Sequence, residues 1–301
     1  MDIGVIGVGA MGKNHVRVYS ELKSVHSLGI YDVNTQAAKI LGEKHDATVY
    51  GSISELLDNS DAVSVVVPTQ FHSGVVGQVF AKKKSVLIEK PICASVKEAK
   101  KLMKTAPEGI TIGVGHIERF NPIVAEIKKI VKNPLYMEFK RHNPTSARIT
   151  GSSVVEDLMI HDIDILLNVF FPDPWDVHSV GNADIMSVLM NCDGIPVSIS
   201  ASRRASKKIR QIYVEDEEFT IEGNFMTQEV IIYRKPGQYH VEAARYVQEN
   251  IIEKVMVNTV EPLKRELEIF IDCVDKNQPF LIPPDQAIRN LEFCEKVSSV
   301  M

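Results

Sequence analysis

The chain has 301 residues, which is enough for about two domains of ordinary size. Its 34 Lys and Arg residues stand against 39 Asp and Glu, a net charge of −5 that argues against a general nucleic-acid-binding protein. No apolar run approaches the roughly 18 residues of a membrane span, and the N-terminus lacks the features of a signal peptide. The four cysteines lie far apart without a CxxC pair, which favours reduced thiols. We therefore expect a soluble, cytoplasmic, two-domain protein.

The first third of the chain alternates short apolar runs with helix-like stretches. Strands are expected at residues 3–9, 27–32, 62–68, 85–91 and 110–115. Helices are expected between them at 13–22, 35–44 and 95–104. The apolar runs are nearly continuous in Val and Ile, as is typical of a parallel sheet covered on both faces. This alternation predicts an α/β fold, with a doubly wound, dinucleotide-binding Rossmann domain over residues 1–119.

The pattern changes in the rest of the chain, where residues 120–301 are expected to form a second, α+β domain. Asn121-Pro122 starts a helix, with a polar cap before a proline at the first helical position, and another helix is expected around 154–170. From about 176 to 234, short runs of period two separated by polar turns predict an antiparallel sheet. Residues 261–275 and 285–299 return to helix, and whether these helices pack back on the first domain stays open.

A G-x-G-x-x-G motif follows the first expected strand and precedes a helix. Its glycines would give a tight turn, a close approach of backbone to pyrophosphate, and close strand–helix packing. Free N–H groups at the helix start would bind the phosphates. Asp32 ends the next strand 20 residues after the motif, where a carboxylate hydrogen-bonds ribose hydroxyls and repels a 2′-phosphate, so NAD is favoured over NADP. The cofactor-binding candidates in the motif are Gly7, Gly9, Ala10, Met11 and Gly12.

Two further segments end strands at the same edge of the predicted sheet. Pro68 and Thr69 are expected in a loop over the cofactor, because ligands bind at the carboxyl ends of strands in such sheets. His72 either contacts the nicotinamide ribose or caps a helix. Glu89 and Lys90, followed by a proline, place an ammonium group near the cofactor, unless the two residues are only a salt-bridged pair.

The segment Asp157-Leu-Met-Ile-His161-Asp162-Ile-Asp164 carries the candidate acid–base pair. At about 100° per residue, Asp157, His161 and Asp164 share one face of an α-helix. Asp157 and His161, at i and i+4, can hydrogen-bond and fix the imidazole tautomer. His161 can then accept a hydroxyl proton while a hydride leaves the same carbon. The alternative is a solvated polar face.

The segment GHIERFNP at 115–122 lies between the two expected domains. His116, Arg119 and Asn121 are candidate substrate-binding residues, because pockets form at domain junctions. Domain-linking salt bridges and a helix cap are the alternative, and they remain open for Glu118 and Asn121.

Two other features, the basic run and the histidines, are not interpreted as functional sites. The basic run at 203–210 is interpreted as a solvated hairpin turn rather than a nucleic-acid site, because the protein is acidic overall. The nine histidines show no metal-binding spacing, so no metal is expected.

Taken in order, four motifs resemble the Gfo/Idh/MocA family of NAD(P)-dependent sugar and inositol oxidoreductases. They are GVIGVGAMG near the N-terminus, EKP at 89–91, D-x-x-x-H at 157–161 and EPLKRELEIFIDCV at 261–274. The resemblance implies a second domain with a large open sheet that often forms oligomer contacts, and hence a homo-oligomer, dimer or tetramer. It also implies a catalytic trio in which His161 is the base, Asp157 orients it or relays the proton, and Lys90 holds the reacting oxygen. The bond between Lys90 and Pro91 is often cis in relatives.

GHIERFNP followed by DLMIHDIDILL resembles the branch of this family that contains UDP-N-acetylglucosamine 3-dehydrogenases. The resemblance implies NAD-dependent oxidation of a secondary sugar hydroxyl, at C3 of a UDP-N-acetylhexosamine, with Lys90 and His161 also contacting the sugar. Bulky residues between Asp157 and His161 replace a glycine found in many relatives, which leaves the exact substrate open. The alternatives are an inositol or free-sugar dehydrogenase and, from another class, a non-catalytic NAD(H)-binding sensor.

Overall fold

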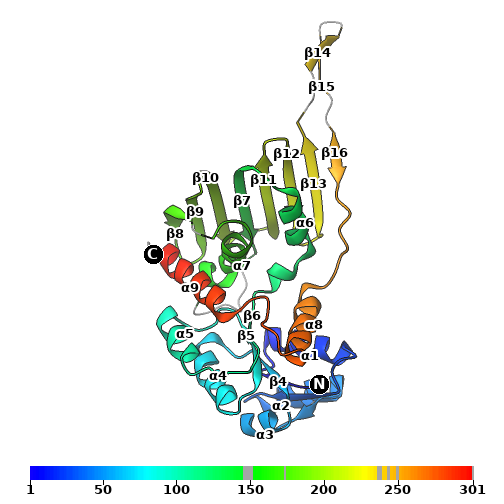
Figure 1. The fold of residues 1–301 in the computed structure, drawn as a ribbon, viewed down its shortest axis with the longest axis vertical. Helices are drawn as coiled ribbons and strands as arrows, with labels where there is room; N and C mark the ends of the chain where they lie inside the picture. Colours follow the sequence, from blue (N-terminus) through cyan, green and yellow to red (C-terminus); the bar gives the residue numbers. More distant parts are fainter. Residues whose placement is uncertain (145–151, 173, 236–238, 243–244, 249–250, 300–301) are drawn as a thin grey trace. The chain divides into compact units, whose positions relative to one another are not determined.

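The computed structural model describes residues 1–144, 152–172, 174–235, 239–242, 245–248 and 251–299 (Figure 1). It divides into two compact units. The first combines Met1–Phe120 with Glu261–Glu292, and the second combines Asn121–Val260 with Phe293–Met301. No helix within the described ranges is long and apolar enough to cross a membrane.

The first unit contains a six-stranded parallel sheet with the strand order β3-β2-β1-β4-β5-β6. Its strands are β1 (Asp2–Ile6), β2 (Ser27–Tyr31), β3 (Thr48–Val49), β4 (Ala62–Val65), β5 (Ser85–Glu89) and β6 (Ile112–Gly115). Every residue of β4 and β5 is buried, which accounts for the continuous apolar runs. The strand order reverses between β1 and β4, the point at which a doubly wound sheet binds ligands. The expected Rossmann architecture is confirmed, with β3 as a strand that the sequence did not predict.

Helices cover this sheet, and three of them carry polar side-chain caps. They are α1 (Ala10–Glu21), α2 (Thr35–His45), α3 (Ile53–Asp58), α4 (His72–Ala81), α5 (Val96–Met103), α8 (Pro262–Asp275) and the first part of α9 (Pro284–Ser298). Asn34, Ser52 and Ser95 each accept a backbone N–H in the first turn of the helix that follows. Helix α8 buries Leu263 and Phe270 in the core of this unit.

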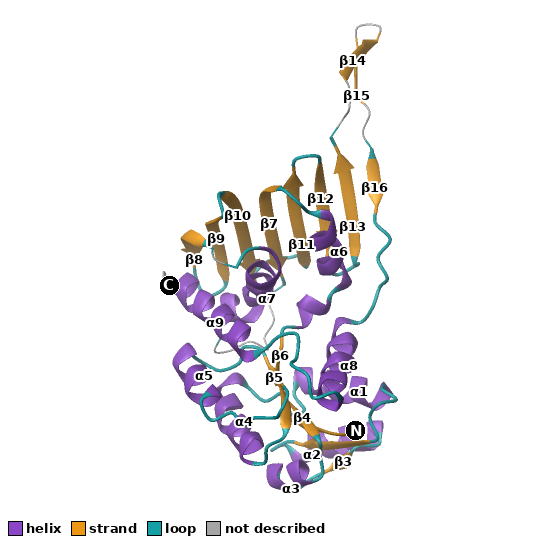
Figure 2. Cartoon of the chain, viewed as in Figure 1, coloured by secondary structure: helices purple, strands orange, loops and turns teal. Residues whose placement is uncertain are grey.

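The second unit contains an eight-stranded sheet with the order β16-β13-β12-β11-β7-β10-β9-β8. Its strands are β7 (Pro134–His142), β8 (Trp175–Gly181), β9 (Ile185–Cys192), β10 (Ile195–Ser202), β11 (Ile209–Asp216), β12 (Phe219–Asn224), β13 (Glu229–Arg234) and β16 (Ile252–Lys254). A separate two-stranded sheet consists of β14 (Tyr239–Glu242) and β15 (Arg245–Gln248). Of the strand pairs described in the eight-stranded sheet, β7 with β10 is parallel and the others are antiparallel. Figure 2 shows α6 (Pro122–Ile130) and α7 (Ile160–Ile165) on one side of the sheet. The α+β class expected for this part of the chain is confirmed.

The central strand β7 was not expected, and it corrects the interpretation of the basic run. Strands β10 and β11 both pair with β7 and not with each other. The segment between them therefore crosses from one side of β7 to the other. The hairpin turn predicted at residues 203–210 is wrong for this reason.

The helix expected around 154–170 is built from three pieces. A π-helical turn, η3 (Val155–Met159), leads into the short helix α7, and a second π-helical turn, η4 (Leu166–Phe170), follows it. Because a π-helix pairs residue i with i+5, the uniform rotation assumed for an α-helix does not hold here. Asp164 is 1% exposed and accepts a hydrogen bond from the Asn168 side chain at 3.1 Å, so the predicted alternative of a solvated face is wrong at this position.

Candidate active site

The turn between β1 and α1 has the shape that its glycines predict. Gly7 has a φ of +99°, a conformation that favours glycine. A Cβ on Gly12 would lie 2.0 Å from the carbonyl oxygen of Gly7, so the strand and helix approach closely only because no side chain is there. A Cβ on Gly9, by contrast, would have no protein atom within 4 Å. Gly9 caps α1, so exposed backbone at the helix start is available to a phosphate.

Asp32 lies beside this turn at the end of β2. Its Oδ2 accepts the N–H of Val8 at 2.6 Å, and its Oδ1 accepts the N–H of Asn34 at 2.7 Å. The carboxylate is therefore held against the glycine turn by the backbone on both sides. The structure thus brings the glycine turn and Asp32, two predicted parts of a dinucleotide site, together. The backbone N–H groups of the turn fit a pyrophosphate, and the Asp32 carboxylate fits the hydroxyls of a ribose.

His72 joins the loops that follow β4 and β5. Its Nε2 is 2.9 Å from the carbonyl oxygen of Val67, and its Nδ1 is 3.0 Å from that of Pro91. The ring is 1% exposed, and α4 begins without a side-chain cap, so the predicted helix-cap role is wrong. Burial has the largest effect on the pKa of His72 and lowers it, while the facing carbonyls act in the opposite direction. Because both ring nitrogens face backbone carbonyl oxygens, His72 braces these loops, and a contact with the nicotinamide ribose stays a prediction.

Glu89 forms a buried pair that the sequence did not predict. Its Oε1 is 3.0 Å from Nε2 of His15 on α1, and its Oε2 accepts the backbone N–H of Lys90 at 3.1 Å. Burial acts to raise the pKa of Glu89, but the hydrogen bond and charge of His15, with the charge of Lys90, lower it below its ordinary value. The half-buried Lys90 precedes a cis peptide bond to Pro91, which the family resemblance implied. Glu89 is therefore a support for the Lys90 backbone.

His116 and Arg119 are bound to α9. Nε2 of the buried His116 is 3.4 Å from Nδ2 of Asn290, and Nη1 of Arg119 donates to Oε1 of Gln286 at 2.5 Å. The predicted substrate-binding segment is thus fixed within the first unit by residues far along the chain.

Asn121 starts the second unit and is 2% exposed. Its Oδ1 accepts the N–H of Ile123 at 3.4 Å, and its Nδ2 donates to the carbonyl oxygen of Phe225 at 3.0 Å. The side chain therefore caps α6, the structural alternative considered for this residue.

The acid–base candidates lie where η3 passes into α7. Ser153 and Glu156 cap the start of this segment reciprocally, because each side chain accepts the other's backbone N–H, at 3.4 Å and 3.1 Å. Asp157 lies in the π-helical turn and His161 in α7, and both side chains are half-buried. Oδ2 of Asp157 and Nδ1 of His161 are shielded from solvent. A direct hydrogen bond between them stays a prediction.

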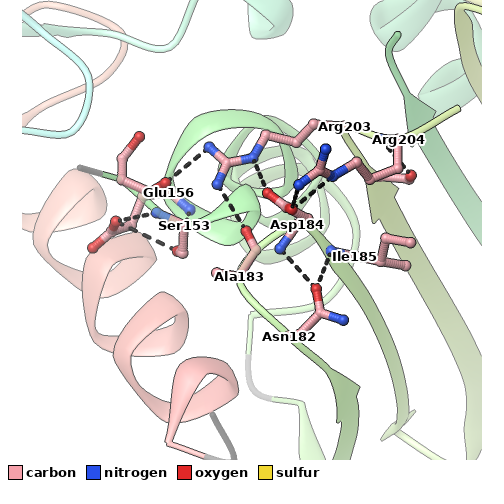
Figure 3. A network of polar contacts seen from close by, with 10 residues as sticks. Ser153, Glu156, Asn182, Ala183, Asp184, Ile185, Arg203 and Arg204 are labelled. Carbon is pink, nitrogen blue, oxygen red and sulfur yellow. Dashed lines mark hydrogen bonds and ion pairs between the residues drawn. The ribbon is translucent and has the colours of Figure 1, made fainter. Parts of the chain in front are cut away.

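The start of the same segment is held by the basic run (Figure 3). Arg203 donates to the carbonyl oxygens of Ser152 at 2.8 Å and Ala183 at 3.0 Å, and to Oδ1 of Asp184 at 3.2 Å. Arg204 donates to Oδ2 of Asp184 at 2.7 Å, and this bond is the main reason that the pKa of Asp184 is lowered. The two arginines thus link the end of β10 to the start of β9, and Arg203 also holds the backbone just before η3.

Comparison with known proteins supports the family resemblance seen in the sequence. Residues 1–116 match the GFO_IDH_MocA family, described as an oxidoreductase family with an NAD-binding Rossmann fold. UDP-N-acetylglucosamine 3-dehydrogenase of Acidithiobacillus ferrooxidans is 28% identical over 288 residues, covering 93% of this chain and 90% of that protein. A solved structure of the same enzyme superposes with a TM-score of 0.88 over 99% of this chain and 96% of that chain, at 27% identity. The nucleotide-binding part of the chain, residues 1–116, therefore resembles the Gfo/Idh/MocA family.

Other proteins similar to this chain have names that indicate different substrates. Inositol 2-dehydrogenase/D-chiro-inositol 3-dehydrogenase of Halalkalibacterium halodurans is 26% identical over 280 residues, covering 88% of this chain and 74% of that protein. Levoglucosan dehydrogenase in complex with NADH has a TM-score of 0.82 over 100% of this chain and 97% of that chain, but only 16% identity, and so shares the fold. The protein is therefore an oxidoreductase with an NAD-binding Rossmann fold.

Proposed function

We propose that this protein is an NAD-dependent dehydrogenase that oxidises a secondary hydroxyl of a sugar, at C3 of a UDP-N-acetylhexosamine. The observation that carries the proposal is the likeness to UDP-N-acetylglucosamine 3-dehydrogenase. That likeness spans 93% of the chain in sequence and 99% in structure, and so it includes the second unit as well as the nucleotide-binding one. The motifs DLMIHDIDILL and GHIERFNP point to the same branch of the family.

The first unit supplies the cofactor site in this proposal. The glycine turn with Ala10 and Met11 would bind the pyrophosphate, and Asp32 would bind the ribose hydroxyls. The nicotinamide, when bound, supplies the hydride acceptor. NAD is favoured over NADP because the Asp32 carboxylate would repel a 2′-phosphate. Pro68 and Thr69 lie in the loop after β4, at the carboxyl edge where the cofactor would bind.

The reaction needs one group to take a proton and another to hold the oxygen. In the proposed mechanism His161 accepts the proton of the C3 hydroxyl, and the C3–H bond breaks to give a hydride and a ketone. Asp157 fixes the tautomer of His161 and stabilises its positive charge. Lys90 donates a hydrogen bond to the reacting oxygen, where negative charge develops. His116 and Arg119 are proposed to contact the sugar or its diphosphate.

A second candidate is an inositol or free-sugar dehydrogenase, favoured by inositol dehydrogenases of 26–29% identity. A sensor that only binds NAD(H) is less well supported, because it does not need the acid–base set of Lys90, Asp157 and His161. We also propose a cytoplasmic homo-oligomer, on the family resemblance alone.

The experiment is a substrate panel read by the near-UV absorbance of reduced nicotinamide. Purified protein with NAD would be given UDP-N-acetylglucosamine, free N-acetylglucosamine, myo-inositol or glucose, with His161→Ala as control. We expect reduced nicotinamide with the UDP-sugar and severe loss of turnover in the control, whose NAD affinity should stay within about threefold. A signal with inositol or glucose alone would favour the second candidate, and no signal despite NAD binding would favour the sensor.

A further inference from the structure

The second unit contains a fully buried ion pair that none of the proposed chemistry uses. Arg141 on β7 donates from Nε to Oδ2 of Asp162 at 3.0 Å and from Nη2 to Oδ1 at 2.7 Å. Both side chains are 1% exposed, and the guanidinium carbon lies 5.3 Å from the centre of the Phe225 ring. The planar fork of Arg141 thus meets the carboxylate in a two-point contact that fixes both distance and orientation.

Stability alone does not explain this pair. Removing two charges from water costs several kcal/mol per ion, and well-packed apolar side chains of similar volume often replace such a pair without loss. The pair is therefore better explained by what it positions. Asp162 follows His161 directly, in the same helix α7.

Helix α7 is the middle part of a helical segment that runs unbroken over residues 154–170. The hydrogen-bond pattern changes where the π-helical turns η3 and η4 adjoin Ile160–Ile165, so side-chain contacts of α7 help to set the direction in which its residues point. The network of Arg203 and Asp184 holds the backbone before η3, at the far end of that turn from α7 (Figure 3). The contact of Asp162 with Arg141 acts on α7 itself, one residue from His161.

We propose that Arg141 is a positioning residue, which fixes the rotation of α7 through Asp162 and thereby the direction of the His161 imidazole. This inference rests on the proposed function, in which His161 is the base. Arg141 does not touch the reacting atoms. It holds the base in the orientation that proton transfer requires, where a displacement of about 1 Å costs as much as a factor of 100 in rate.

The test uses Arg141→Lys, which keeps the charge but loses the fork, and the double variant Arg141→Met with Asp162→Leu, which removes both charges. The matched control is Arg234→Lys. Arg234 on β13 makes the same two-point contact with Glu253 on β16, at 2.8 and 3.1 Å, but both side chains are more than 40% exposed. We expect Arg141→Lys to lower kcat about 10- to 100-fold with KM and NAD affinity changed less than about threefold. The control, Arg234→Lys, should have the same kcat, KM and NAD affinity as wild type.

A second readout does not depend on turnover. The ring nitrogens of His161, observed by NMR in the resting protein and assigned with His161→Gln, should titrate differently in Arg141→Lys and unchanged in Arg234→Lys. An unchanged His161 titration overturns the proposal, whether or not any sugar is oxidised. So does a double variant that is as stable as wild type and fully active. A shifted titration in a protein that oxidises no sugar supports the link between Arg141 and His161 and refutes the proposed function instead.

Discussion

Replacing Gly9 by alanine is expected to weaken dinucleotide binding while leaving the fold intact. A Cβ at this position meets no protein atom within 4 Å, and the extended backbone, with φ −66° and ψ −155°, lies outside the left-handed region that favours glycine. Stability should therefore stay equal to wild type or rise by up to about 1 kcal/mol, because alanine restricts the unfolded chain. The added methyl group instead occupies the space beside the first turn of α1, where the pyrophosphate is proposed to bind.

The size of the binding loss follows from the contact that would be broken. One hydrogen bond from a backbone N–H to a charged phosphate oxygen is worth about 1.5–3 kcal/mol. Its loss corresponds to a rise in the Kd for NAD of roughly 10- to 150-fold.

Gly12→Ala is the matched comparison, because its Cβ meets protein instead of open space. The new carbon would lie 2.0 Å from the Gly7 carbonyl oxygen. Real Cβ atoms essentially never come closer than 3.0 Å to another heavy atom, so the turn must move by about 1 Å. Overpacking of this kind costs about 1–3 kcal/mol of stability. Gly12→Ala should therefore lose both stability and NAD binding, whereas Gly9→Ala loses only binding.

Calorimetric titration with NADH and thermal unfolding without it separate these two effects. Equal NADH affinity in Gly9→Ala and wild type would refute the assignment of this turn to the pyrophosphate. A drop in Tm for Gly9→Ala as large as that for Gly12→Ala would refute the reasoning from local packing.

Three further expectations test other parts of the account. Asp32→Ala should weaken NAD binding and change the ratio of the Kd for NAD to the Kd for NADP in favour of NADP. An unchanged ratio would show that Asp32 is not the ribose ligand. Lys90→Met should lower kcat much more than it weakens NAD binding, so a pure binding defect would contradict its role at the reacting oxygen. The pKa of Glu89 is lower in the folded protein than in the unfolded chain. Its pair with His15 therefore stabilises the fold at pH values above the unfolded pKa of about 4.3. This stabilisation is lost as the pH falls through the folded pKa. The free energy of unfolding, measured across this acidic range, should therefore decline less steeply in Glu89→Gln, and identical slopes would contradict the argument.

Much of the first unit could be predicted from sequence because its signals are local. Continuous Val and Ile runs mark buried parallel strands, and the glycine motif fixes the turn before α1. The partners of these residues were harder to predict, because they depend on contacts between distant segments. His15 reads as one polar residue in a helix, and only the fold places it against Glu89, 74 residues later.

The second unit shows the limits of periodicity more clearly. Strand β7 was missed because the buried Arg141 interrupts the apolar alternation expected of a central strand. The face drawn through Asp157, His161 and Asp164 assumed uniform α-helical rotation, which the π-helical turns break. A local signal for the start of this segment did exist in the Ser153-x-x-Glu156 capping box, whereas nothing local indicated that Asp162 pairs with a buried arginine.

The most direct test of the central claim follows the hydride itself. UDP-N-acetylglucosamine deuterated at C3 would be incubated with the protein and NAD, and the reduced nicotinamide examined by mass spectrometry and NMR. The account predicts one deuterium on the nicotinamide ring and a sugar product with a ketone at C3. Reduced nicotinamide without deuterium, or a sugar product that keeps its deuterium, would contradict oxidation at C3.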